Sequence, residues 1–248
     1  MELDITFQQL GIAEEMRNSK VQQILAAVRD HSMVHETGIL FTIASVVYVL
    51  KHGIPGLFIE CGTWKGGCSV AMLLAQRELF GAVQRPVVMM DSFEGLPTVT
   101  PQDGPLAAQW QAGADQEKFF DNCRAAQAEL QTLLDHHGFA PSDYRLVHGW
   151  FDQTAPALAL ELAEQPVGIL RLDGDWYDST AVTLRHLCPA VSEQGIVIVD
   201  DYYAWDGCAR AVHEYLVHKD LPYRVKSLPY NFGAYFVKRR NRTSFNEF

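Results

Sequence analysis

Short apolar runs alternate with longer stretches of helical periodicity along most of the chain. The runs that predict strands cover residues 57–61, 86–91, 144–149, 167–173 and 195–200, and helical patterns fill 69–80, 116–136, 179–191 and 208–218. Most of the runs are almost entirely apolar, as is typical of strands buried on both faces of a parallel sheet. The alternation predicts a doubly wound α/β sheet with right-handed crossovers.

Both ends of the chain depart from this alternation. Residues 223–228 and 232–238 predict two strands joined by a short turn, an antiparallel hairpin that closes the parallel sheet. Residues 1–52 predict a helical cap or lid ahead of the first strand. We therefore divide the chain into a cap at 1–52, a main domain at 53–240 and a tail at 241–248.

Composition and charge exclude several classes of protein. The 248 residues are 48% hydrophobic and 20% charged, as in an ordinary globular protein, which argues against a disordered chain or a coiled coil. The formal charge of −10 repels phosphate backbones, so nucleic acid is not expected as a partner. We interpret Lys238, Arg239, Arg240 and Arg242 as a solvated basic tail.

Location follows from the apolar segments and the cysteines. The longest apolar stretch, residues 38–50, is too short to span a bilayer, so no membrane partner is expected. The N-terminus lacks the pattern of a signal peptide. The five cysteines are odd in number and contain no CxxC pair, which disfavours a disulfide framework or a structural zinc site. We therefore expect a cytoplasmic protein.

Acidic residues stand at the ends of the predicted strands. Glu60, Asp91, Asp173 and the pair Asp200-Asp201 each follow an apolar run. In open α/β sheets, ligands bind beyond the carboxyl ends of the strands. A single acidic residue there is equally consistent with a helix cap. The repetition at several strand ends predicts a binding site along this edge.

The first two strand ends indicate the kind of cofactor. Residues 60–67 (ECGTWKGG) match neither the dinucleotide fingerprint nor a phosphate-binding loop. The Glu-x-Gly start points instead to S-adenosylmethionine, with Gly62 leaving room for the cofactor, although an ordinary tight turn would also explain it. Asp91 is placed to accept hydrogen bonds from ribose hydroxyls. The Gly/Pro-rich stretch 92–113 predicts a long loop without a helix, of the kind that covers active sites.

The last strand ends indicate a metal. Asp173, Asp200 and Asp201 end two strands that we expect to be adjacent, and three carboxylates cannot all stay charged there without a cation. Oxygen ligands favour a hard ion such as Mg²⁺. We interpret the nine histidines as solvated or packed side chains. Trp64, Trp150 and Trp176 fall near the same edge and either wall the site or belong to the core.

Five motifs together resemble one family. The segments ECGTWKGG (60–67), DSFEGLP (91–97), GWF (149–151), LRLDGDWYDST (170–180) and IVDDY (198–202) resemble the macrocin O-methyltransferase (TylF) family over residues 54–216. The resemblance implies a Rossmann-like class I methyltransferase fold with a mostly parallel seven-stranded sheet. It implies an enzyme that uses S-adenosylmethionine and Mg²⁺ to methylate a hydroxyl, typically on a sugar of a natural product.

The resemblance also assigns residues. Asp175 matches the general base, and the metal ligands are Asp173, Asp200 and Asp201. The cofactor-binding set is Met33, Val34, Glu60, Cys61, Gly62, Thr63, Ser69, Asp91, Ser92, Gly149, Trp150, Phe151 and Asp173.

The acceptor is less well defined. Residues 36–45 depart from the family pattern, so the resemblance does not define the acceptor pocket or the acceptor. We expect a small acceptor, either a glycosylated metabolite or a saccharide. A homodimer is one candidate assembly. The alternative function is a metal-dependent glycosyltransferase that uses the Asp173/Asp175 pair, but no basic residue for a diphosphate lies nearby except Arg171, inside a predicted strand.

Overall fold

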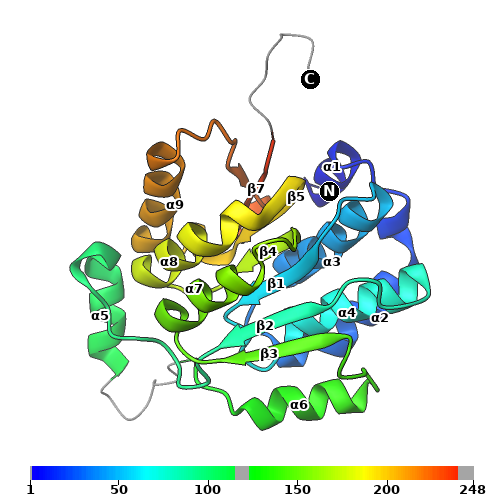
Figure 1. Cartoon of the computed structure of the whole chain (residues 1–248), viewed down its shortest axis with the longest axis horizontal. Helices are drawn as coiled ribbons and strands as arrows, with labels where there is room; N and C mark the ends of the chain where they lie inside the picture. The colour runs from blue at the N-terminus through cyan, green and yellow to red at the C-terminus, as the bar shows by residue number, and fades with distance from the viewer. Residues whose placement is uncertain (1, 115–122, 240–248) are drawn as a thin grey trace.

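A seven-stranded sheet forms the centre of the computed structural model, which describes residues 2–114 and 123–239. Its strand order is β3-β2-β1-β4-β5-β7-β6 (Figure 1). The strands are β1 (Leu57–Cys61), β2 (Val87–Asp91), β3 (Tyr144–His148), β4 (Val167–Leu172), β5 (Val191–Val199), β6 (Lys226–Ser227) and β7 (Ala234–Val237). The first five pair in parallel, and β7 pairs antiparallel with both β5 and β6. This arrangement confirms the predicted fold class.

Helices cover both faces of this sheet. They are α1 (Glu2–Gln9), α2 (Ser19–Val28), α3 (Glu36–Lys51), α4 (Gly67–Phe80), α5 (Gly104–Ala114), α6 (Gln127–His136), α7 (Phe151–Glu161), α8 (Tyr177–Leu187) and α9 (Asp206–His218). Short 3₁₀ turns connect several of them: η1 (Glu15–Arg17), η2 (Arg29–His31), η3 (Pro101–Asp103), η4 (Cys188–Ala190), η5 (Asp200–Tyr202) and η6 (Pro229–Asn231).

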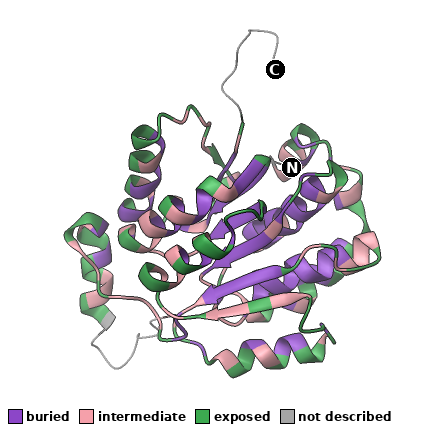
Figure 2. Cartoon of the chain, in the orientation of Figure 1, coloured by how far each residue is buried: buried purple, intermediate pink, exposed green. Residues whose placement is uncertain are grey.

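The two faces of the sheet bury two separate apolar cores. Successive strand side chains point to opposite faces. In β4, Ile169 packs with residues of α2, α3 and α4, whereas Leu170 packs with residues of α7, α8 and α9. Figure 2 shows the central strands buried, while β3 at the edge is only partly covered. The strands are therefore solidly apolar because helices cover them on both sides.

The N-terminal residues are helical, as predicted. Buried side chains of this segment, including Phe7, Ile12 and Val28, belong to the same core as strand residues of the sheet. The helices therefore pack on the sheet, and the segment between η2 and α3 passes close to the start of α4. A Cβ on Gly67 would lie 2.7 Å from the His31 carbonyl oxygen. The boundary at residue 52 stays a prediction.

Two predictions for the segment between β2 and β3 were wrong. The stretch 92–113 was predicted as a loop without a helix, but it contains η3 and α5. Gly104 and Pro105 stand in the first turn of α5, where proline costs no helical hydrogen bond. The helix predicted at 116–136 begins only at Gln127, where Glu129 accepts a hydrogen bond from the Ala126 N–H at 3.1 Å. Residues 115–122 lie outside the described part of the chain.

The C-terminal hairpin is confirmed but shorter than predicted. Only two residues of β6 pair with β7, and η6 makes the turn between them. Tyr230 and Asn231 both have positive φ there (58° and 60°), a conformation that the hydrophobic pattern does not reveal. The predicted tail at 241–248, which includes Arg242, and the preceding Arg240 lie outside the described residues.

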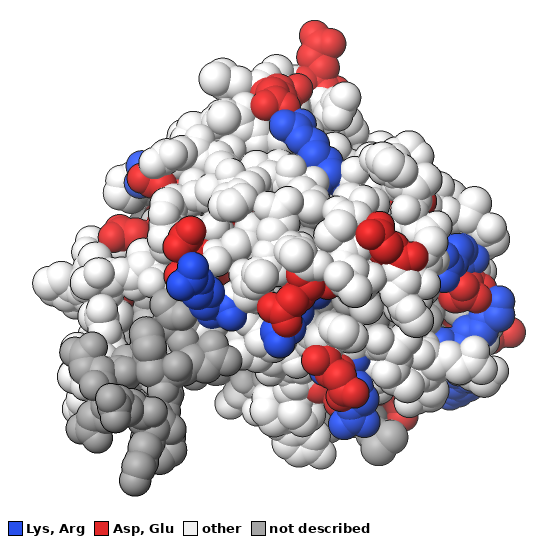
Figure 3. Space-filling view, turned by 90° about the horizontal axis from the view of Figure 1, so that it is seen from below, with Lys and Arg blue, Asp and Glu red and all other residues white. Residues whose placement is uncertain are grey.

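Basic and acidic side chains are interspersed on the surface. Exposed ion pairs include Arg145 with Glu161 at 2.5 Å and Lys65 with Glu129 at 3.0 Å. Figure 3 shows one face on which basic and acidic side chains neighbour one another rather than forming a basic patch. Among the helices in the described ranges, none combines the length and the apolar character that a membrane crossing requires.

Candidate active site

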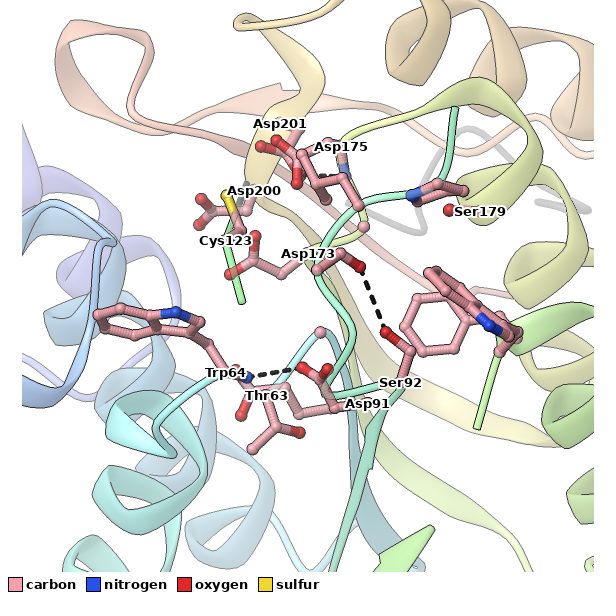
Figure 4. Close-up of a pocket in the computed structure, with 18 of the residues that line it drawn as sticks. Thr63, Trp64, Asp91, Ser92, Cys123, Asp173, Asp175, Ser179, Asp200 and Asp201 are labelled. Carbon is pink, nitrogen blue, oxygen red and sulfur yellow. Dashed lines mark hydrogen bonds between the residues drawn. The ribbon is translucent and has the colours of Figure 1, made fainter. Parts of the chain in front are cut away.

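A cavity of about 720 Å³ opens at the carboxyl ends of β1, β2, β4 and β5. All the acidic residues predicted at strand ends line it: Glu60, Asp91, Asp173, Asp200 and Asp201. Figure 4 shows the aspartates that follow β4 and β5 on one side of this pocket, and Thr63, Trp64 and Asp91 on another. The prediction that these strand ends share one edge is confirmed.

The predicted cofactor residues fall into two groups. Those that line the cavity are Met33, Val34, Glu60, Gly62, Thr63, Asp91, Ser92, Gly149, Trp150, Phe151 and Asp173. Cys61 and Ser69 do not line it. The Cys61 thiol contacts the Met90 sulfur at 3.7 Å inside the core, and the Ser69 hydroxyl donates a hydrogen bond to the Glu60 carboxylate.

The turn after β1 packs closely against the backbone that follows β4. Gly62 has φ 92°, and a Cβ there would lie 1.6 Å from the Asp173 carbonyl oxygen. The main reason for glycine at this position is therefore the close approach of the chain after β1 to the chain after β4. The sequence had suggested a different reason, namely space for a cofactor.

Asp91 joins two turns at the edge of the cavity. Its carboxylate accepts the Trp64 N–H at 2.7 Å on one oxygen and the Phe93 N–H at 2.7 Å on the other. A carboxylate oxygen has a second lone pair, so Asp91 can still accept hydrogen bonds from a ligand. The indole N–H of Trp64, which also lines the cavity, is buried and has no hydrogen-bond partner in the described part of the chain.

A buried arginine beneath the cavity floor was not assigned a site role from the sequence. Arg171 in β4 is fully buried and pairs with Glu60 at 3.3 Å, Asp173 at 3.1 Å and Asp200 at 2.8 Å. Burial raises the pKa of Glu60 to about 7, against the opposing effect of the Arg171 charge. The one visible signal was a charged residue inside an otherwise apolar strand, since buried charges are generally paired.

Three carboxylates cluster beside this arginine. Ligand atoms of Asp173, Asp175 and Asp201 all lie within 4.8 Å of one another. Burial and the neighbouring carboxylates raise the pKa values of Asp173 and Asp201 well above the usual range, and that of Asp175 to about 7. Asp200 directs one oxygen at Arg171. The cluster thus contains two predicted metal ligands and the predicted base.

Further residues of the wall come from α8, from the 92–103 segment and from two tryptophans. They include Leu96, Pro97, Trp110, Tyr177, Ser179, Val182, Arg185 and Trp205, none of which was assigned a site role from the sequence. Trp176 is buried outside the lining and donates its indole N–H to the Pro97 carbonyl at 2.9 Å. The buried Asp103 of η3 accepts the Tyr177 N–H at 2.6 Å and fastens the 92–103 segment to α8.

The fold and the site define a class I methyltransferase architecture. Among solved structures, the O-methyltransferase NovP is similar, with a TM-score of 0.73 and 28% identity over 85% of this chain and 83% of that one. The calicheamicin methyltransferase CalS11 shares the fold at a TM-score of 0.66 and 21% identity, over 88% of this chain and 91% of that one.

The family is also defined by sequence. The family model for macrocin O-methyltransferase (TylF) matches residues 16–238, and the chain belongs to this family. An 8-demethyl-8-(2,3-dimethoxy-alpha-L-rhamnosyl)-tetracenomycin-C 4'-O-methyltransferase of Streptomyces olivaceus is 35% identical over 67% of this chain. The mycinamicin III 3''-O-methyltransferase of Micromonospora griseorubida is 33% identical over 67% of this chain. These matches span 60% and 62% of the two relatives.

Proposed function

We propose that the protein transfers a methyl group from S-adenosylmethionine to a sugar hydroxyl of a natural product, with the aid of Mg²⁺. The observation that carries the proposal is a single cavity that joins Glu60 and Asp91 to the cluster of Asp173, Asp175 and Asp201. Family membership supports methyl transfer, and the relative from Streptomyces olivaceus is named for a rhamnosyl substrate.

Glu60 and Asp91 would hold opposite ends of the cofactor. S-adenosylmethionine supplies an electrophilic methyl group on a positively charged sulfur. Glu60, at the floor of the cavity, would accept hydrogen bonds from the cofactor's ammonium group, and Asp91 would accept them from its ribose hydroxyls. Met33 and Val34 line the same cavity and would cover the methionine portion. The buried Trp64 indole N–H offers a further donor that fits a polar ligand here.

The aspartates fit a hard divalent cation. We propose Asp173, Asp200 and Asp201 as the residues that hold Mg²⁺, because the donor set is all oxygen and the charges of these carboxylates raise one another's pKa values. When bound, the cation supplies Lewis acidity that makes an acceptor hydroxyl easier to deprotonate.

Asp175 would accept the hydroxyl proton. One of its oxygens is engaged by an indole N–H, and its side chain lies on the cavity wall among the other aspartates (Figure 4). The walls formed by α8 and the tryptophans would align the acceptor oxygen behind the methyl group, since displacement at carbon requires an in-line approach.

The glycosyltransferase alternative finds little support. The basic residue that the sequence offered for a nucleotide diphosphate, Arg171, is fully buried and paired with three carboxylates, and Arg185 of α8 is the arginine that lines the cavity. The family match also favours methyl transfer.

Location and assembly stay proposals. We propose a cytoplasmic protein because the buried cysteines Cys61, Cys68, Cys188 and Cys208 form no disulfide. A homodimer stays a prediction.

Asp91→Ala is expected to weaken binding of S-adenosylmethionine and of S-adenosylhomocysteine by about 1–3 kcal/mol, the range for hydrogen bonds to a charged group. Calorimetry measures both. Asp135→Ala, which removes an exposed aspartate on α6, serves as the control and should leave binding unchanged. Equal affinity of the Asp91→Ala variant and the parent would remove Asp91 from the cofactor site.

Transfer of a labelled methyl group tests the function itself. A panel of glycosides and phenols is incubated with labelled S-adenosylmethionine and Mg²⁺, and the products are identified by mass. Label on a sugar hydroxyl is expected. Methylation confined to phenols would contradict the sugar assignment, and sugar transfer from a nucleotide-sugar would contradict methyl transfer.

A further inference from the structure

A tryptophan side chain makes a direct hydrogen bond to the proposed base. The Trp205 indole N–H donates to one carboxylate oxygen of Asp175 at 2.9 Å, and both residues line the cavity. Trp205 comes from the turn between η5 and α9, whereas Asp175 follows β4, so the contact joins two segments that are 30 residues apart.

Asp175 needs such an anchor. Its backbone has φ 55°, a left-handed conformation that is uncommon for residues other than glycine. Its N–H donates to the Asp201 carboxylate at 3.0 Å, which fixes the main chain. The side chain still has a broad terminal torsion, and Asp173 and Asp201 repel its charge. The bond from Trp205 is the contact that holds one oxygen and leaves the other for an acceptor.

Trp205 is itself held rigidly. Its backbone N–H donates to the Asp201 carbonyl at 3.0 Å, so one residue anchors the main chain of Trp205 and that of Asp175. Its ring makes edge contacts with Trp176 at 4.9 Å and with Trp110 at 6.1 Å between centroids. Such aromatic packing restricts the ring and therefore the direction of its N–H.

We infer that Trp205 is a positioning residue that orients the Asp175 carboxylate for proton transfer. The inference rests on the proposed function, in which Asp175 is the base. Trp205→Phe keeps an aromatic ring and removes the donor. A misplaced base slows the chemical step, so kcat should fall on the order of 10- to 100-fold. The KM of the acceptor and the Kd of S-adenosylhomocysteine should stay within about threefold.

Trp176 provides a matched control from the same cluster. Trp176→Phe also removes an indole N–H, but that group donates to the Pro97 carbonyl rather than to Asp175. Its kcat should fall less than that of Trp205→Phe, because phenylalanine keeps an aromatic ring against Trp205 and the Trp205 donor remains. A general loosening of the aromatic cluster would lower kcat in both variants equally, and that result would overturn the assignment to Trp205.

A second measurement does not depend on the turnover of the Phe variants. The indole N–H resonances of the five tryptophans are assigned with Trp205→Phe and Trp176→Phe, and Asp175→Asn is then compared with the parent. Loss of the carboxylate charge should shift the Trp205 resonance and leave that of Trp176 in place. An unmoved Trp205 resonance would overturn the contact.

The outcomes separate this inference from the function on which it rests. If Asp175→Asn loses turnover while Trp205→Phe keeps it, the positioning role is wrong and the base assignment stands. If Asp175→Asn keeps full turnover, both are wrong. Loss in Asp175→Asn and in Trp205→Phe, with a smaller loss in Trp176→Phe, supports the role of Trp205.

Discussion

Asp175→Asn is expected to lower turnover by on the order of 10²–10⁴, the usual effect of removing a general base. Asparagine has nearly the same shape and still accepts the Trp205 N–H, but it cannot take up the hydroxyl proton. Binding of Mg²⁺ and of S-adenosylhomocysteine should stay close to that of the parent. Steady-state kinetics with the identified acceptor, together with calorimetry for both ligands, measure these effects.

The pH profile gives an independent reading of the same residue. A base must be ionised to act, so turnover should rise as pH increases through the pKa of Asp175. Burial and the neighbouring Asp173 raise this pKa to about 7, and a bound cation would lower it again. The rise should therefore lie at or below pH 7, and Asp175→Asn should lose it. Asp206→Asn, which changes an exposed aspartate beside Trp205, should keep it.

An unchanged rate and an unchanged pH profile in Asp175→Asn would contradict the assignment. The cation alone would then activate the hydroxyl, and Asp175 would only shape the turn after β4.

Removal of the divalent cation should abolish turnover, and added Mg²⁺ should restore it. Asp201→Asn should lower Mg²⁺ affinity at least about tenfold, because even residues that only support a ligand contribute 10- to 100-fold. The affinity for S-adenosylhomocysteine should change less. Calorimetric titration with Mg²⁺ and activity assays with a chelator measure these effects, and full activity in excess chelator would contradict the metal assignment.

Two variants distinguish the possible ligand sets. Asp173 and Asp201 belong to both candidate ligand sets. The third ligand is Asp200 in the set expected from the family resemblance and Asp175 in the observed cluster. Under the proposed function, Asp200→Asn weakens Mg²⁺ binding and Asp175→Asn does not. The reverse result would place Asp175 in the metal site and leave Asp200 as the partner of Arg171.

Local sequence patterns predicted the sheet and its acidic edge because both follow from short-range rules. Apolar runs of strand length separated by helical stretches indicate parallel strands, and parallel strands end at one edge, so Glu60, Asp91 and Asp173 had to meet there. The helix α5 was missed because Gly104 and Pro105 look like loop residues, although both are tolerated in a first helical turn.

Contacts between distant segments were not predictable in this way. The pairing of Arg171 with three carboxylates depends on the register of β1, β4 and β5, which the sequence does not state. The Trp205 contact depends on the path of the turn before α9. The family resemblance named the residues of the site, but it did not show that Cys61 and Ser69 stand behind the cavity or that Asp103 fastens the covering segment.

Calorimetric titration of the protein with S-adenosylhomocysteine tests the proposed function most directly, because it requires no knowledge of the acceptor. Saturable binding is expected, weakened by Asp91→Ala and unaffected by Asp135→Ala. The same titration with NAD and with a nucleotide-sugar should show no comparable affinity. Binding of either of these in preference to S-adenosylhomocysteine would contradict methyl transfer as the activity of this cavity.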